Sequence, residues 1–244
     1  MGAIHITKRY VLSLNLTPSP LGLKLYYDFM SPPCRVLYVL LKTSKCNFEP
    51  KLLDMGKGQQ LKPEYEAINR FKKIPAIDHN GFILMESVAI TKYLARENMI
   101  SKTLYPEDSK GQARVDEYLE WQHVGLKLPG NLFFMTSFIN PLMTGKTPDP
   151  KQVDSYKQKM INALEEFDKL WLGCNKFFDL HLLTIGTSFL FTELPDFDPT
   201  ADFPNIAKWW PKVREHFNPC YDEAHVILNK VIKLNASKLN KNIK

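Results

Sequence analysis

The spacing of apolar residues changes once along this 244-residue chain, near residue 98. Before that point, short apolar runs typical of strands alternate with stretches in which apolar residues recur at helical spacing. From residue 109 onward the helical spacing is almost continuous. A chain that changes in this way is expected to fold as a mixed α/β domain followed by an all-helical domain, and its length is sufficient for both.

The first domain is predicted to follow the order strand, helix, strand, helix, strand, strand, helix. The strands are expected at residues 23–28, 48–53, 74–77 and 82–85, and the helices from residue 32, at 61–68 and at 87–96. The dipeptide Asn80-Gly81 between the last two strands is a strong hairpin signal. A strand–helix–strand start gives a parallel pair with a crossover, and the hairpin adds antiparallel strands. This is a thioredoxin-like arrangement.

The second domain is predicted to consist of helices at residues 111–139, 152–172, 204–216 and 219–234. The first of them is open to a break at Pro129-Gly130. Residues 177–203 are harder to assign, although Phe189–Leu194 is expected to form a buried helix. The chain is therefore divided into a flexible extension (1–21), a thioredoxin-like domain (22–98), a linker (99–108), a helical domain (109–235) and a basic tail (236–244).

Positive charge gathers at the two ends of the chain, whose formal net charge is +6. Residues 1–20 contain Lys8 and Arg9 but no acid, and no acid follows Glu223. Such ends fit solvated tails, and they also fit weak attraction to anionic lipid or nucleic acid. The start of the chain fits a flexible extension better than a transit peptide. No apolar run is long enough to span a membrane, and we expect no nucleic-acid partner.

The four cysteines give no sign of a metal site or a disulfide framework. Cys34, Cys46, Cys174 and Cys220 form no C-x-x-C pair and no cluster with zinc-ligand spacing. We therefore expect a protein of a reducing compartment, the cytoplasm, that needs no metal.

A first candidate for chemistry lies between the first strand and the first helix. A helix N-terminus offers unpaired N–H groups and partial positive charge, which favour an anion such as a thiolate. Ser31 fits an ordinary N-cap ahead of a proline, and it also fits a reactive hydroxyl at this place. Cys34, in the first turn, fits a reactive thiol or a small buried hydrophobe.

Two further candidates lie at later junctions. Pro75 forces Ile74 to be extended, and a cis bond between them would leave the Ile74 backbone unpaired and able to bond a peptide-like ligand. An ordinary proline at the start of a strand is the alternative. Glu86 and Ser87 offer an anion and a hydroxyl at a strand-to-helix junction, where a plain capping pair would look the same.

Six short segments acquire their meaning from their order and spacing. They are Ser-x-Pro-Cys-Arg (31–35), Lys-Gly-Gln (57–59), Asn-Arg-Phe-Lys-Lys-Ile-Pro-Ala (69–76), Glu-Ser-Val-Ala-Ile (86–90), Tyr-Pro-x-Asp (105–108) and Arg-Val-Asp-Glu-Tyr-Leu-x-Trp-Gln-His (114–123). Together they resemble the cytosolic glutathione transferases, most nearly the theta class and its insect members. The resemblance implies a detoxifying homodimer that uses glutathione as co-substrate and conjugates its thiolate to small electrophiles or reduces organic peroxides.

The resemblance also implies how glutathione would be held. Ser31 would donate a hydrogen bond to the sulfur, and because that bond favours the charged form it would lower the pKa of the thiol. Lys73 and Ile74 match the glutathione-binding pair beside the cis-proline of the family, and Ile74 would bond the backbone of the tripeptide. Glu86 and Ser87 would hold the ammonium and carboxylate of the γ-glutamyl group.

Two positions on the predicted long helix would serve the second substrate. His123 and Lys127 are four residues apart and so share one helical face. By the resemblance, a cation at Lys127 would stabilise a leaving halide or sulfate. A solvated helix face is the alternative interpretation of the same pair.

Three residues depart from the pattern of the family. Pro32 replaces the usual glutamine. Gln60 replaces a histidine and would donate to the glycyl carboxylate without carrying charge. Thr187 replaces the aspartate of a capping motif in the second domain. These departures favour, as an alternative, a binding protein on the same fold that has lost turnover. A second alternative is a thiol transferase centred on Cys34, since Ser31 occupies the first position of a would-be C-x-x-C pair.

Overall fold

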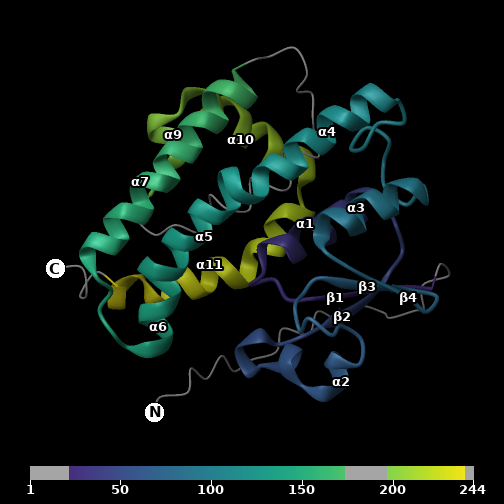
Figure 1. Cartoon of the computed structure of the whole chain (residues 1–244), viewed down its shortest axis with the longest axis horizontal. Helices are drawn as coiled ribbons and strands as arrows, with labels where there is room; N and C mark the ends of the chain where they lie inside the picture. Colours follow the sequence, from purple (N-terminus) through teal and green to yellow (C-terminus); the bar gives the residue numbers. More distant parts are fainter. Residues whose placement is uncertain (1–21, 174–196, 240–244) are drawn as a thin grey trace.

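The computed structural model describes residues 22–173 and 197–239 (Figure 1). The first domain comprises β1 (Leu23–Tyr27), α1 (Pro32–Thr43), β2 (Glu49–Leu52), the 3₁₀ turns η1 (Met55–Lys57) and η2 (Gln59–Leu61), α2 (Pro63–Glu66), β3 (Ala76–His79), β4 (Phe82–Met85) and α3 (Ser87–Arg96). The predicted thioredoxin-like order of strands and helices is confirmed. The predictions for the extension at 1–21, for Thr187 and for a helix at 189–194 lie outside the described residues.

The four strands form one mixed sheet in the order β2-β1-β3-β4. β1 is parallel to β2 and antiparallel to β3, and β3 is antiparallel to β4. In this register Tyr26 lies opposite Ala76, and Ala76 lies opposite Met85. The end of β1, the start of β3 and the end of β4 therefore meet at one edge of the sheet. Each of the predicted glutathione-binding segments at 31, 73–74 and 86–87 adjoins that edge.

The hairpin between β3 and β4 forms at the predicted dipeptide. Asn80 and Gly81 both have positive φ, 54° and 90°. A two-residue hairpin turn of the kind that matches strand twist needs positive φ at both central residues, which asparagine and glycine tolerate best. This local chemistry fixes the antiparallel half of the sheet.

The second domain is helical throughout its described part. It comprises α4 (Ser109–Gln122), the π turn η3 (His123–Lys127), α5 (Leu128–Phe134), the π turn η4 (Met135–Ile139), α6 (Asn140–Thr144), α7 (Pro150–Glu166), the π turn η5 (Phe167–Leu172), α9 (Pro199–Asp202), α10 (Pro204–Phe217) and α11 (Cys220–Leu239). Among the described residues, no helix has the length and apolar character needed to cross a membrane.

The first long helix does not break at Pro129-Gly130, where the sequence left a break open. A proline inside a helix lacks its N–H and its ring clashes with the carbonyl four residues earlier. Here η3 directly precedes α5, and its wider π turn makes room for the ring of Pro129. The turn η4 stands in the same relation to Pro141. The helical path therefore continues from Ser109 to Thr144.

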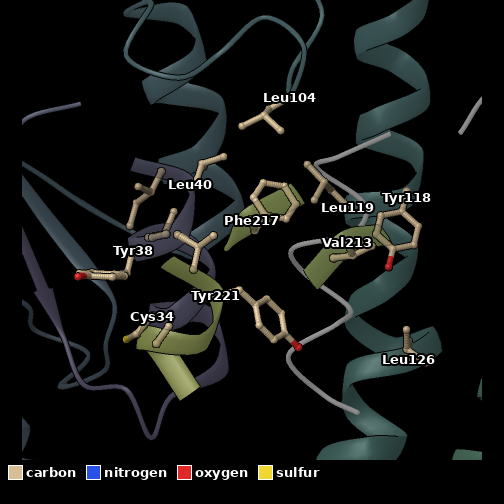
Figure 2. Close-up of a cluster of buried hydrophobic side chains, with 14 of the residues drawn as sticks. Cys34, Tyr38, Leu40, Leu104, Tyr118, Leu119, Leu126, Val213, Phe217 and Tyr221 are labelled. Atoms are coloured by element: carbon tan, nitrogen blue, oxygen red, sulfur yellow. The ribbon is translucent and has the colours of Figure 1, made fainter. Parts of the chain in front are cut away.

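The apolar core runs without interruption from one domain into the other. Figure 2 shows Phe217 and Tyr221 between Cys34 and Leu40 of α1 and the side chains of α4. All of these residues belong to one buried cluster, which also includes Tyr118, Leu119, Leu126 and Val213. Consequently the C-terminal helices pack directly on the helix that opens at the predicted reactive serine.

The start of α10 is capped from another helix. Its N-cap residue, Phe203, has no side chain that can accept a hydrogen bond, so the first N–H groups need partners elsewhere. The buried carboxylate of Asp168 accepts from the backbone N–H groups of Asn205 and Ile206, each at 2.8 Å. This long-range cap connects η5 to the start of α10 and so stabilises the packing of these two elements.

Candidate active site

The loop that carries Ser31 is held in place by hydrogen bonds between the side chain of Asp28 and backbone N–H groups. Asp28, buried at the end of β1, accepts from Met30 N through Oδ1 and from Met55 N through Oδ2, both at 2.8 Å. The N–H of Ser31 donates to the carbonyl of Asp28 at 3.0 Å. The single carboxylate of Asp28 thus connects the serine loop to η1, the turn that precedes Gln60.

Ser31 occupies the N-cap position of α1, but its side chain does not cap the helix. Its backbone is extended, with φ −89° and ψ 117°, and its hydroxyl makes no capping hydrogen bond to the backbone N–H groups of the first turn. Pro32 and Pro33 fill the first two helical positions and remove two N–H groups that an anion would otherwise meet. A thiolate bound at this helix start would therefore meet fewer backbone N–H groups, and the hydroxyl of Ser31 would be a donor available in their place.

Cys34 is fully buried beneath that hydroxyl. Burial raises the pKa of its thiol to about 12, against a smaller lowering by a side-chain hydrogen bond with Ser31. A thiol with such a pKa is protonated at neutral pH, and the thiolate is the nucleophilic form. The geometry therefore favours the small buried hydrophobe over the reactive thiol for Cys34.

The bond between Ile74 and Pro75 is cis, as predicted. Within the described residues, neither the N–H nor the carbonyl of Ile74 takes part in a hydrogen bond. The preceding carbonyl, that of Lys73, accepts from the hydroxyl of Tyr65 at 2.8 Å and from the side-chain amide of Asn69 at 2.6 Å. These two bonds orient the segment while leaving the backbone of Ile74 available to a ligand.

Sequence reasoning missed Tyr65 and Asn69, although both are almost fully buried. A buried polar side chain is recognisable only when its burial is known, because exposed Asn and Tyr are common at turns. The sequence signal was weak: both residues lie within the stretch 61–76, four residues apart, just ahead of the conspicuous Ile74-Pro75.

Glu86 and Ser87 lie where β4 passes into α3, and Glu86 has a strained backbone. Its φ of 66° with ψ of 111° falls in a region that non-glycine residues rarely adopt, and its side chain makes no cap bond. Such strain persists only where the surroundings impose it, and it concentrates at binding sites. The carbonyl of Ser87 accepts from the hydroxyl of Thr91 at 2.9 Å.

Gln60 has a buried side-chain oxygen, Oε1, that lacks a hydrogen-bond partner among the described residues. Its neighbour Gln59 is already engaged, since its Oε1 accepts from the N–H of Asp54 at 2.7 Å. A buried polar atom without a partner costs free energy, so such atoms point to a missing ligand or water. Because Oε1 is an acceptor, it suits a bound N–H, O–H or water, and a carboxylate would have to be met by the amide nitrogen of Gln60 instead.

His123 and Lys127 both lie in η3, where His123 is exposed and Lys127 faces the first domain. Lys127 is half-buried and lines a cavity of about 20 Å³ together with Ser87, Thr91 and Gln122. Burial lowers the pKa of Lys127 to about 8. The pKa of His123 is lowered by burial and by Lys127, and raised by the charges of Glu120 and Glu86.

The structure thus brings Lys127 and Ser87 to one cavity between the domains. A larger open groove, of about 660 Å³, lies between η3 and α7 and includes none of the predicted site residues. Among residues 22–173 and 197–239, no group of three or more His, Cys, Asp or Glu side chains is placed to hold a metal ion.

A thioredoxin-like domain with a cis-proline, a serine at the start of the first helix and a helical second domain defines a glutathione transferase. Residues 21–96 match the family model described as Glutathione S-transferase, N-terminal domain. A theta-1 glutathione S-transferase of Bos taurus is 31% identical over 86% of this chain and 90% of its own length. The chain belongs to the glutathione S-transferase family, among its theta-class members.

Solved structures agree with this assignment. Human theta-2 glutathione transferase in complex with glutathione is similar with a TM-score of 0.78 and 26% identity, over 89% of this chain and 91% of that chain. A human theta-class transferase in complex with the glutathione conjugate of 1-menaphthyl sulfate gives a TM-score of 0.79 at 26% identity, over 88% of this chain and 90% of that chain.

Proposed function

We propose that this protein conjugates the thiolate of glutathione to small electrophiles, or uses it to reduce organic peroxides, with Ser31 as the catalytic residue. The observation that carries the proposal is the hydroxyl of Ser31, buried at the start of α1 yet not used as a helix cap. It lies at the sheet edge where the cis-proline segment and the junction at Glu86 also meet.

The chemistry follows from these positions. The backbone of Ile74 bonds the tripeptide, Gln60 donates to its glycyl carboxylate, and Glu86 with Ser87 binds its γ-glutamyl group. The hydroxyl of Ser31 then donates to the sulfur. A free thiol with a pKa of about 8.5 is mostly protonated at neutral pH, and a donor to the charged form lowers that pKa. The thiolate attacks the electrophile, and the leaving group departs with the electron pair of the bond that breaks.

The test is retention on immobilised glutathione followed by a conjugation assay with a panel of small electrophiles and an organic peroxide. We expect both retention and turnover. Retention without turnover on any member of the panel would support a binding protein on the same fold. Absence of retention, with the protein shown to be folded, would contradict the proposal.

Replacement of Cys34 by alanine separates the serine mechanism from a thiol transferase. We expect most of the kcat/KM for conjugation to remain, because burial keeps the thiol protonated and away from substrate. The half-buried Cys220 provides a matched control, Cys220→Ala, for general effects of removing a thiol. Loss of activity in Cys34→Ala, with Ser31→Ala tolerated, would instead indicate a cysteine-type enzyme.

The charge of Lys127 predicts how pH affects an anionic electrophile. Lysine is charged below its pKa, which burial lowers here to about 8, so the charge is lost as the pH rises through 8. Between about pH 7 and 9 the charged fraction falls about tenfold, and we expect KM for a sulfate-bearing electrophile to rise by up to the same factor. The quantity to measure is the ratio of KM for the sulfate-bearing electrophile to KM for an uncharged electrophile. The titration of glutathione affects both values and cancels in this ratio.

The variant Lys127→Arg is the control for this pH effect, because arginine keeps its charge across the range. Its ratio of KM values should be flat with pH. A flat ratio in the unaltered protein would show that Lys127 does not contact the anion and that the pair with His123 is a solvated face.

The remaining assignments rest on family membership. We infer a homodimer in the cytoplasm, with the thioredoxin-like domain at residues 22–98, a linker at 99–108 and the helical domain at 109–235. The relatives are named glutathione S-transferases, which supports glutathione as the co-substrate of this chain.

A further inference from the structure

A fully buried arginine lies one turn into α1, directly behind the serine loop. Arg35 has no solvent exposure and is among the largest side chains buried in the described part of the protein. Its Nη1 donates to the carbonyl of Phe29 at 2.5 Å. Arginine is almost never fully buried without polar partners, because removing its charge from water is costly. The burial of this guanidinium therefore indicates that Arg35 has a role that an apolar side chain could not perform.

Arg35 holds the serine loop at two points. Its side chain holds the carbonyl of Phe29, two residues before Ser31, and its backbone N–H donates to the carbonyl of Ser31 itself at 3.2 Å. Asp28 holds the same loop through the N–H of Met30 at 2.8 Å. The carbonyl of Phe29 and the N–H of Met30 belong to one peptide group, and both are bonded to buried charged side chains. That peptide group therefore has little freedom to rotate.

The direction of the Ser31 hydroxyl depends on that peptide. A rotation about the bonds of Met30 would carry Ser31 with it, and displacement of a catalytic group by about 1 Å can cost on the order of a hundredfold in rate. A carbonyl bonded to a guanidinium resists such a rotation better than one bonded to water, because the bond is charge-assisted. The buried arginine therefore sits where it can define the position of the hydroxyl.

We propose that Arg35 is a positioning residue for Ser31, which acts by fixing the carbonyl of Phe29 so that the serine hydroxyl reaches the sulfur of glutathione. The inference rests on the proposed function and adds a residue to that site. Arg35 touches neither substrate in this role, and its effect on the sulfur passes through the loop.

A purely structural role is the competing explanation, since α1 packs on α11. Arg35 lies near Tyr221 of α11, and the hydroxyl of the nearby Tyr38 donates to Glu223 of α11 at 2.7 Å. Loss of Arg35 could therefore loosen the contact between the domains. Tyr38→Phe removes the second link to α11 and keeps the ring, so it is the matched control for that effect.

The test compares Arg35→Met with Tyr38→Phe in the full-length protein. For each we would measure the melting temperature, kcat and KM for conjugation, and the pKa of bound glutathione from its thiolate absorbance. Both variants should melt lower. Only Arg35→Met should raise the pKa of the bound thiol, by roughly 1, and lower kcat/KM by about 10- to 100-fold with KM for glutathione within about threefold of the original.

Arg35→Lys keeps a cation with N–H donors but loses the planar guanidinium, and it should recover part of the loss. If Arg35→Met fails to fold, this milder variant carries the test, and a bound thiol with an unchanged pKa would overturn the proposal. Equal pKa values in Arg35→Met, Tyr38→Phe and the unaltered protein would overturn it as well. Failure of the unaltered protein to bind or turn over glutathione would contradict the proposed function itself, which keeps the two failures distinguishable.

Discussion

Replacement of Ser31 by alanine is expected to lower kcat/KM for conjugation by roughly 10- to 150-fold at neutral pH. This range corresponds to the loss of one hydrogen bond to a charged partner, about 1.5–3 kcal/mol. The pKa of bound glutathione should rise, and raising the pH should recover much of the activity because solvent then removes the proton. The measurement is a titration of thiolate absorbance in both proteins, together with pH profiles of kcat/KM.

The stability of Ser31→Ala is expected to change little, since the side chain makes no cap bond to α1. Asp108 offers the opposite case: its carboxylate caps α4 by accepting from the N–H of Gly111 at 2.8 Å. Asp108→Ala should cost about 1 kcal/mol of folding free energy and leave activity unchanged. If Ser31→Ala behaved like Asp108→Ala, with the thiol pKa unaltered, Ser31 would be a cap and another group would activate glutathione.

Replacement of Glu86 by glycine is expected to move binding and stability in opposite directions. Glycine adopts the φ of 66° without strain, so relief of a strain of about 1–3 kcal/mol should raise the melting temperature. Loss of the carboxylate removes a charge-assisted bond to the γ-glutamyl ammonium, so KM for glutathione should rise by about 10- to 150-fold. Thermal denaturation and steady-state kinetics on the same preparation measure both effects.

Glu86→Gln provides the control, because it keeps the strained backbone and removes only the charge. It should weaken glutathione binding without the gain in stability. A Glu86→Gly protein that binds glutathione as tightly as the original would remove Glu86 from the site, and one that is less stable would show that the surroundings require the side chain rather than impose the strain.

Most of the architecture of the first domain was predictable, because the signals for it are local. The turn at Asn80-Gly81 depends on the backbone preferences of two residues, and the short apolar runs mark the strands on either side. The order of the site segments at 31, 74 and 86 was also visible, since each adjoins the end or start of a strand. Their meeting at one sheet edge follows from the register of three strands, which only pairing across the chain establishes.

The second domain was predictable in its helices but not in how proline is accommodated. The sequence left a break at Pro129 open because a proline removes a hydrogen bond and clashes with the previous turn. The π turn η3 resolves that clash and at the same time places Lys127 against the first domain. A π turn is a rare local rearrangement stabilised by packing, and the apolar spacing of the sequence does not distinguish it from an α-helix.

The sequence alone determined the thioredoxin-like order, the family and the identity of the residues expected to bind glutathione, because local turn chemistry and characteristic motifs carry that information. Only the tertiary structure decided the burial and the hydrogen-bond partners of those residues. It showed that the hydroxyl of Ser31 does not cap α1, that the thiol of Cys34 is buried, and that Arg35 donates to the carbonyl of Phe29 in the loop before Ser31. Burial and long-range hydrogen bonding arise from contacts between segments distant in the chain, and they set the energetic cost of every charge and donor at the site.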